Sequence, residues 1–144
     1  MKRDPINPES FYHIYNRSNG KKKIFFNNAD FGKFIEILTR AKNQHDVIID
    51  TYCIMPNHYH LLVKLDANSI AMGNFVKSLQ ISYAKYYNKK YNHTGHVFGG
   101  EYKREEVETN DYYEKVKKYI LKNPVKAELA KDSKKWPYSG HFQW

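Results

Sequence analysis

The sequence predicts an α+β fold of the ferredoxin-like (RRM-like) kind: an antiparallel sheet with helices packed on one face, and an extra late helix. Segments with the periodicity of strands and of helices follow one another in the order strand, helix, strand, strand, helix, strand, before the extra helix. This order is the split βαβ pattern of ferredoxin-like sheets. The length of 144 residues fits a single domain over residues 1–144 better than two domains.

The chain begins with a strand and a helix. In Phe11–Ser18 apolar positions alternate with others until Asn19-Gly20 interrupts the run, which is typical of a strand. From Ala29 to about Asn43 the apolar residues recur at helical spacing. Either Asn28 or Asp30 is available as the N-cap of this first helix.

Two strands follow, joined by a tight turn. Val47–Met55 is rich in β-branched and aromatic residues, and His58–Leu65 alternates in character. Pro56-Asn57 between them favours a turn. We therefore expect an antiparallel pair.

A long second helix and a loop come next. Ser69 can cap the helix, whose broad apolar stripe continues to about Tyr91. His93–Gly100 then loses all periodicity and contains three glycines, so it is predicted to be a loop.

The last predicted strand is Tyr102–Glu108, followed by a third helix. One of residues 109–111 can cap this helix. It is expected to run to the Asn123-Pro124 junction, because proline disfavours the helical conformation of the residue before it.

The composition is basic and aromatic. Lys and Arg number 24 against 15 Asp and Glu, a net charge of +9, and there are 13 Tyr. Cations interleaved with aromatic rings favour nucleic acid as partner over a membrane surface. The alternative is a solvated basic surface over a core that holds many of the tyrosines.

The cellular compartment is expected to be the cytoplasm. The single Cys53 has no partner for an internal disulfide, and the first residues lack the apolar core of a signal peptide. No apolar run approaches the roughly 18 residues that suggest a membrane span.

His58 and His60 lie one residue apart on a predicted strand, so the pleat directs both imidazoles to the same face. Two imidazoles on one face can bind a metal ion. The alternative is a structural pair that is hydrogen-bonded to its neighbours.

The segment Met55-Pro56-Asn57-His58-Tyr59-His60-Leu61-Leu62 resembles the HUH motif of single-tyrosine transposases, especially REP-associated tyrosine transposases and their insertion-sequence relatives. The resemblance extends in order over almost the whole chain. The other matching segments are Tyr12-His13-Ile14-Tyr15-Asn16-Arg17, Ile24-Phe25-Phe26, Gly95-His96-Val97-Phe98, Tyr102-Lys103, Tyr119-Ile120-Leu121-Lys122-Asn123-Pro124-Val125-Lys126-Ala127 and Trp136-Pro137-Tyr138-Ser139.

The resemblance implies a DNA transposase. The enzyme would cleave and rejoin single-stranded or hairpin DNA through a covalent 5′-phosphotyrosine, with Mg²⁺ or Mn²⁺ bound by His58 and His60. By the same match Tyr119 is the nucleophile, carried on the late helix, and Asn123 is the third metal ligand. These two residues are four apart and therefore neighbours on one helical face, although Pro124 could tilt Asn123 out of helical geometry. The alternative for Tyr119 is a core aromatic.

Cations near these residues are candidates for DNA binding. Lys115, Lys118 and Lys122 recur at helical spacing beside Tyr119, where they would meet a DNA backbone, or else form a solvated face. Arg17 belongs to the first strand, which a ferredoxin-like sheet places next to the strand of the two histidines, so it could contact the scissile phosphate.

The chain departs from the family pattern in one loop, and two other functions are compatible with its sequence. Many relatives have Gln-Gly-Arg where this chain has Gly99-Gly100-Glu101, so a polar side chain and a cation are missing from that loop. A non-catalytic single-stranded nucleic-acid-binding module of the same fold is one alternative function, and an HUH nicking nuclease with no role in transposition is another. Whether the protein forms a homodimer is left open by the sequence.

Overall fold

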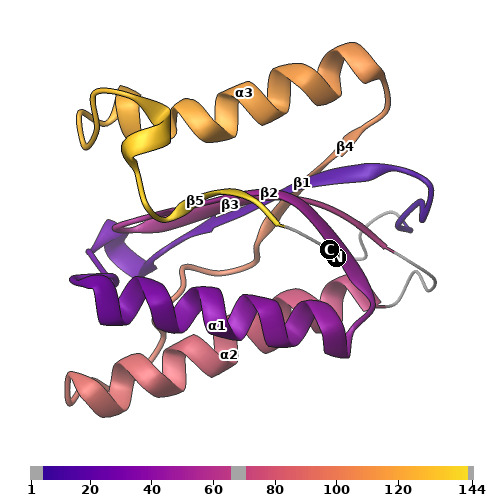
Figure 1. The fold of residues 1–144 in the computed structure, drawn as a ribbon. Coiled ribbons are helices and arrows are strands. Elements are labelled where there is room, and N and C mark those ends of the chain that lie inside the picture. The colour runs from indigo at the N-terminus through magenta and orange to yellow at the C-terminus, as the bar shows by residue number, and fades with distance from the viewer. Residues whose placement is uncertain (1–4, 66–70, 143–144) are drawn as a thin grey trace.

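The computed structural model describes residues 5–65 and 71–142, and its centre is a five-stranded antiparallel sheet (Figure 1). The strands lie in the order β4-β1-β3-β2-β5. Their bounds are β1 Phe11–Arg17, β2 Val47–Met55, β3 His58–Leu65, β4 Lys103–Val107 and β5 Ser139–His141. The α+β fold with an antiparallel sheet is thus confirmed.

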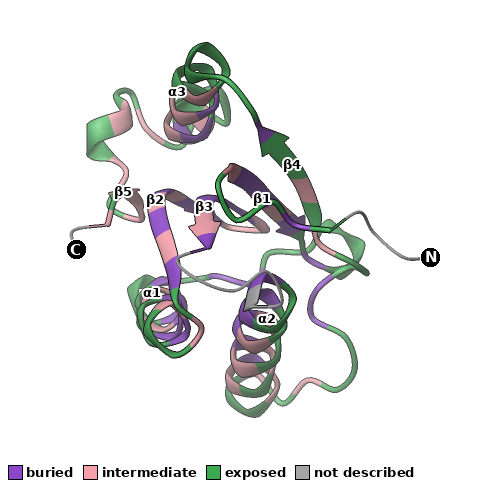
Figure 2. Cartoon of the chain, turned by 90° about the vertical axis from the view of Figure 1, so that its right-hand side faces the viewer, coloured by how far each residue is buried: buried purple, intermediate pink, exposed green. Residues whose placement is uncertain are grey.

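Helices cover both faces of the sheet. Helices α1 (Asn28–Gln44) and α2 (Ala71–Lys90) pack on one face, and α3 (Asn110–Lys126) lies on the opposite face (Figures 1 and 2). Two short 3₁₀ helices, Asn19–Lys21 and Ser133–Lys135, lie in the connections. The extra late helix is therefore present, and the structure places it on the face that α1 and α2 leave uncovered.

The main core lies between the sheet and the helices α1 and α2. It is built from strand residues that point away from α3, such as Ile14, Tyr59 and Leu61, and from the apolar stripes of both helices. A smaller cluster lies beneath α3 and consists of Cys53, Met55, Leu62, Val107, Val116 and Ile120. Because β3 alternates between these two cores, His60 must share the face of Leu62 and lie beneath α3.

The register of β1 against β3 brings two further residues to the same face. Arg17 pairs with His58, and Tyr15 pairs with His60. The predicted adjacency of these two strands is confirmed. On its other edge β1 pairs with β4, which sets His13 opposite Glu105.

The N-cap of α1 differs from the prediction. Asn27 caps the helix, and its side chain accepts a hydrogen bond from the Asp30 backbone N–H at 3.1 Å. Asp30 instead reaches back to the backbone N–H of Phe26 at 2.9 Å, so the two side chains satisfy donors reciprocally. Asp30 is fully buried and also binds Lys90 at 2.7 Å, which ties α1 to α2.

The third helix continues beyond its predicted end. Thr109 caps it, as one of the three candidates, but α3 passes through Pro124 and ends at Lys126. Proline removes one hydrogen bond of the helix, and a site in the last turn limits that loss. The carbonyl of Pro124 accepts from the backbone N–H of Leu129 at 2.8 Å. Asn123 consequently stays within regular helix.

Two features near the ends of elements remain. Strand β5 was not predicted, because three residues that include Gly140 carry no alternation, yet it pairs with β2 at the sheet edge. Ser69, the predicted cap of α2, lies outside the described residues. Among the helices of the described residues, none is long and apolar enough to span a membrane.

Candidate active site

The sequence-predicted residues of the site meet in one pocket between β1, β3 and α3. His58, His60, Tyr119 and Asn123 all line this cavity of about 640 Å³, and Arg17 lines it as well. We call it the active-site pocket. Strand β3 supplies the histidines, and one turn of α3 supplies Tyr119 and Asn123. The structure therefore gathers five residues whose positions span more than 100 residues of sequence.

His60 is buried and is held by a second histidine. Its Nδ1 lies 2.9 Å from Nε2 of His13, and the two rings are stacked. Burial lowers the pKa of His60 to about 3, and the nearby His13 and His58 contribute to that shift. Burial likewise lowers the pKa of His13 to about 4, although Glu105 opposes that shift. Both rings are therefore neutral at neutral pH, and one hydrogen links them.

That link fixes which nitrogen of His60 remains available. When Nδ1 of His60 donates to Nε2 of His13, the Nε2 of His60 keeps a free lone pair for a metal ion. The predicted adjacency of β1 and β3 is compatible with this contact, but the sequence did not single out His13 as a partner of His60.

His58 is oriented by amide side chains. Its Nδ1 lies 2.7 Å from Oδ1 of Asn57, an atom that only accepts, so Nδ1 carries the hydrogen and Nε2 is left with the lone pair. Burial lowers the pKa of His58, while a hydrogen bond with Asn123 raises it. The rings of His58 and His60 lie 5.1 Å apart and nearly perpendicular.

Tyr119 lies over the buried histidines and is open to solvent. Its ring centroid is 5.6 Å from that of His60 and 5.9 Å from that of His13, with edge-to-face geometry in both cases. The residue is 45% exposed, so it is not the core aromatic that its spacing allowed; Val116 and Ile120 take that role on α3. Lys126 lies with its Nζ 5.3 Å from the Tyr119 ring. A tyrosine hydroxyl is thus available beside two neutral imidazoles.

Asn123 is positioned by the turn of helix that it shares with Tyr119. Its Nδ2 donates to the carbonyl oxygen of Tyr119 at 2.9 Å. This bond uses one hydrogen of the amide and leaves Oδ1 as an acceptor in the pocket that His58 also lines. The tilt out of helical geometry that Pro124 could have caused is absent, since α3 continues to Lys126.

The donor atoms fit a divalent ion. No three His, Cys, Asp or Glu side chains gather into a metal-binding group among the described residues. The side chains of this pocket that could hold such an ion are His58 and His60, each through Nε2, and Asn123, through its amide oxygen. Neutral nitrogen and oxygen donors of this kind suit Mg²⁺ or Mn²⁺, which would keep its charge for a phosphate.

The predicted DNA-binding cations are distributed unequally. Arg17 lines the active-site pocket, together with Lys21 and Lys103, which the sequence did not single out. Lys115 lines a neighbouring cavity. Lys118 and Lys122 are exposed on α3 and are not among the described residues that line either pocket.

The loop that departs from the relatives' pattern also lines the active-site pocket. The backbone N–H of Gly99 donates to the carbonyl of Arg17 at 2.9 Å, and a Cβ at this position would lie 3.3 Å from the carbonyl of Ser18. Glycine therefore lets the loop pack closely on the end of β1. At this edge of the pocket the loop contributes the backbone of Gly99, where many relatives have a polar side chain.

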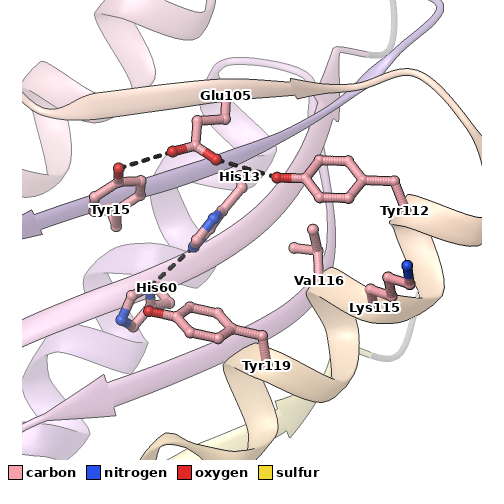
Figure 3. Close-up of a pocket in the computed structure, with 8 residues that line it drawn as sticks. All are labelled: His13, Tyr15, His60, Glu105, Tyr112, Lys115, Val116 and Tyr119. Atoms are coloured by element: carbon pink, nitrogen blue, oxygen red, sulfur yellow. Dashed lines mark hydrogen bonds between the residues drawn. The ribbon is translucent and has the colours of Figure 1, made fainter.

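A second, smaller cavity of about 310 Å³ adjoins the active-site pocket (Figure 3). The two cavities share Tyr15, His60 and Tyr119. Figure 3 shows Glu105 between two tyrosines, and its carboxylate accepts from the hydroxyl of Tyr15 at 3.0 Å and from that of Tyr112 at 3.2 Å. Burial and this carboxylate together raise the pKa values of both tyrosines. This cavity could not be predicted from the sequence, because it depends on the register of β4.

Comparison with solved structures supports the fold. A REP-associated tyrosine transposase bound to a REP hairpin matches with a TM-score of 0.77 and 16% identity, over 96% of this chain and 80% of that one. A protein assigned as a transposase, from Deinococcus radiodurans, matches with a TM-score of 0.56 and 19% identity, over 83% of this chain and 95% of that one. Comparison with curated proteins gives no significant match.

Comparison with family models decides the family. The model described as "Transposase IS200 like" matches residues 8–123, which include β1, both histidines of β3, and α3 through Asn123. Since this match covers most of the chain and all of the residues gathered in the active-site pocket, the protein belongs to the IS200-like transposase family.

Proposed function

We propose that this protein is a metal-dependent, single-tyrosine DNA transposase that cleaves and rejoins single-stranded or hairpin DNA. Tyr119 is the nucleophile, and His58, His60 and Asn123 hold Mg²⁺ or Mn²⁺. The observation that carries the proposal is the position of the exposed Tyr119 ring, 5.6 Å from the ring of His60 in the pocket that His58 and Asn123 also line.

The reaction exchanges one phosphate ester for another. The oxygen of Tyr119 forms a bond to the scissile phosphorus, the bond from phosphorus to the 3′ oxygen of the preceding nucleotide breaks, and the phenolic proton is lost as that 3′ oxygen gains one. The product is a 5′-phosphotyrosine that keeps the energy of the ester for rejoining. A bound divalent ion neutralises the charge of the phosphate and orients it for in-line attack.

The protein's own residues prepare this arrangement. His13 and Asn57 each occupy the Nδ1 of a metal-binding histidine and so direct both Nε2 atoms outward. Arg17 and Lys103, at the edge of the same pocket, supply positive charge for the phosphates. A divalent ion held by these histidines would help the hydroxyl of Tyr119 to lose its proton as the bond to phosphorus forms.

Two observations favour single-stranded or hairpin DNA as the substrate. The nucleophile lies in a pocket among β1, β3 and α3, where a flexible backbone can enter more readily than a stiff duplex. The structural neighbour with a TM-score of 0.77 is bound to a REP hairpin.

The experiment that tests this function combines metal removal with loss of the ligands. The wild-type protein and a His58→Ala/His60→Ala variant are incubated with labelled single strands and hairpins, with Mg²⁺ or Mn²⁺ and then with a chelator. We expect cleavage by the wild type with metal only, and retained DNA binding without cleavage by the variant. Cleavage that persists in excess chelator would contradict metal dependence, and binding without cleavage by the wild type would favour the non-catalytic module.

A further inference from the structure

We infer that the cavity beside Tyr119 is a nucleobase subsite that selects a base carrying an exocyclic amino group. We call it the base pocket. Its polar group is the carboxylate of Glu105, and its walls include the rings of Tyr15, Tyr112 and Tyr119. The inference deepens the proposed function, on which it rests, because it names the base expected next to the scissile phosphate.

The position of the base pocket follows from the residues that it shares with the active-site pocket. Tyr15, His60 and Tyr119 line both cavities. A strand whose phosphate lies at Tyr119 therefore has an adjoining base within reach of the base pocket. The volume of about 310 Å³ is at the small end of the range of ligand pockets, ~300–1,000 Å³, which suits one base better than a larger group.

Glu105 determines what kind of group the base pocket accepts. Its two oxygens accept from Tyr15 at 3.0 Å and from Tyr112 at 3.2 Å, which fixes the carboxylate in place (Figure 3). Each oxygen has two lone pairs, so one hydrogen bond leaves each able to accept another. Negative charge here repels a phosphate and attracts an uncharged N–H donor.

Amino groups meet this requirement better than the edge of thymine. Cytosine, adenine and guanine each present an exocyclic NH₂, and carboxylates in proteins accept from the N4 amino group of cytosine. Thymine and uracil have a single N–H between two carbonyl oxygens, and those oxygens would face the carboxylate.

The walls of the base pocket supply stacking. The ring of Tyr15 packs on those of His13, at 4.7 Å, and His60, at 5.7 Å, which holds it in place, while the rings of Tyr112 and Tyr119 are 40% and 45% exposed. Exposed aromatic faces stack bases of any sequence, and the carboxylate then adds the discrimination. Lys115 at the same cavity can meet the phosphate of the bound nucleotide.

The experiment measures binding and needs no cleavage. Fluorescence anisotropy compares an oligodeoxycytidine with an oligodeoxyuridine of the same length, which differ at C4, where cytosine has an amino group and uracil a carbonyl. We expect the wild type to bind the oligodeoxycytidine about tenfold more tightly, as one good base contact provides. In Glu105→Gln this ratio should fall to about one, because a terminal amide offers both a donor and an acceptor.

The matched control is Glu106→Gln. Glu106 is the next residue of β4, points to the other face, and accepts from the hydroxyl of Ser10 at 2.7 Å. This variant removes the same charge and should keep the preference for cytosine. Equal binding of the two oligonucleotides by the wild type, or an unchanged ratio in Glu105→Gln, would overturn the inference. If the wild type prefers the oligodeoxycytidine but forms no covalent adduct with DNA, the proposed function is contradicted and the inference about the base pocket is not.

Discussion

The orientation of His60 depends on His13, a residue that is distant in the sequence. The pleat of β3 directs His58 and His60 to one face, and this much follows from their spacing. The state of the His60 ring depends on His13, which β1 places 2.9 Å from its Nδ1. The sequence predicts which side chains of β1 share a face. It does not predict that His13 meets His60, because that contact depends on the register between β1 and β3.

The first prediction concerns this pairing. Replacing His13 by Ala should weaken Mn²⁺ binding by about 10–100-fold, the usual effect of losing a group that orients a metal-binding histidine. Titration calorimetry of the DNA-free protein measures the affinity directly. His93→Ala is the control, because His93 hydrogen-bonds Asn88 at the end of α2. Equal affinities in the His13→Ala and wild-type proteins would show that His60 does not need this partner.

The second prediction is a dependence of stability on pH. Burial lowers the pKa values of His60 and His13 to about 3 and about 4, below the ~6.5 of an unfolded histidine. Below pH ~6.5 the unfolded chain therefore binds protons that the folded protein does not, and the free energy of unfolding must decrease as the pH falls toward ~4.

Urea unfolding of the metal-free protein between about pH 7.5 and about pH 4 tests this dependence. A variant with His13→Gln and His60→Gln should show a shallower decline over the same range. A free energy of unfolding that stays constant across the acid half of this range would show that the two rings are not held in the neutral form.

Helix α3 determines which side chains face the two histidines of β3. Its buried residues Val116 and Ile120 anchor it to the sheet, and Tyr119 between them is exposed above the histidines. Sequence periodicity predicted this helix and its cap, but it placed the end at Asn123, because proline usually ends a helix. The tertiary context overrides that preference, and the extra residues bring Lys126 to the Tyr119 ring.

The third prediction tests the cationic face of α3. Replacing Lys115, Lys118 and Lys122 by Ala should reduce the slope of log affinity against log salt concentration. The expected reduction is about 0.7 for each phosphate of a single strand that a lysine no longer neutralises. A matched control is the replacement of Lys77, Lys85 and Lys89 on α2, which removes equal charge from the other side of the sheet. Equal changes in slope for the two triple variants would mean that only net charge matters.

The order of strands and helices along the chain was enough to predict most of the fold. Within residues 5–65 and 71–142, the sequence predicted four of the five strands, all three helices and the antiparallel sheet, because each of these elements has a long periodic segment. Strand β5 is too short for a pattern and is held by Trp136, whose indole N–H donates to the carbonyl of Ile54 at 3.0 Å. The base pocket was also out of reach, since it needs the register of β4 against β1 to bring Glu105 over His13.

Trapping the covalent adduct tests most directly whether Tyr119 attacks DNA. Wild-type, Tyr119→Phe and Tyr113→Phe proteins are incubated with labelled single strands and Mn²⁺, denatured, and examined for label that stays with the protein. Tyr113 is the matched control on the same helix, where its hydroxyl donates to Asp50 and it lines neither the active-site pocket nor the base pocket. We expect an adduct in the wild type and in Tyr113→Phe, mapped by peptide mass to Tyr119, and none in Tyr119→Phe. An adduct of undiminished yield in Tyr119→Phe, mapped to another tyrosine, would contradict this role of Tyr119.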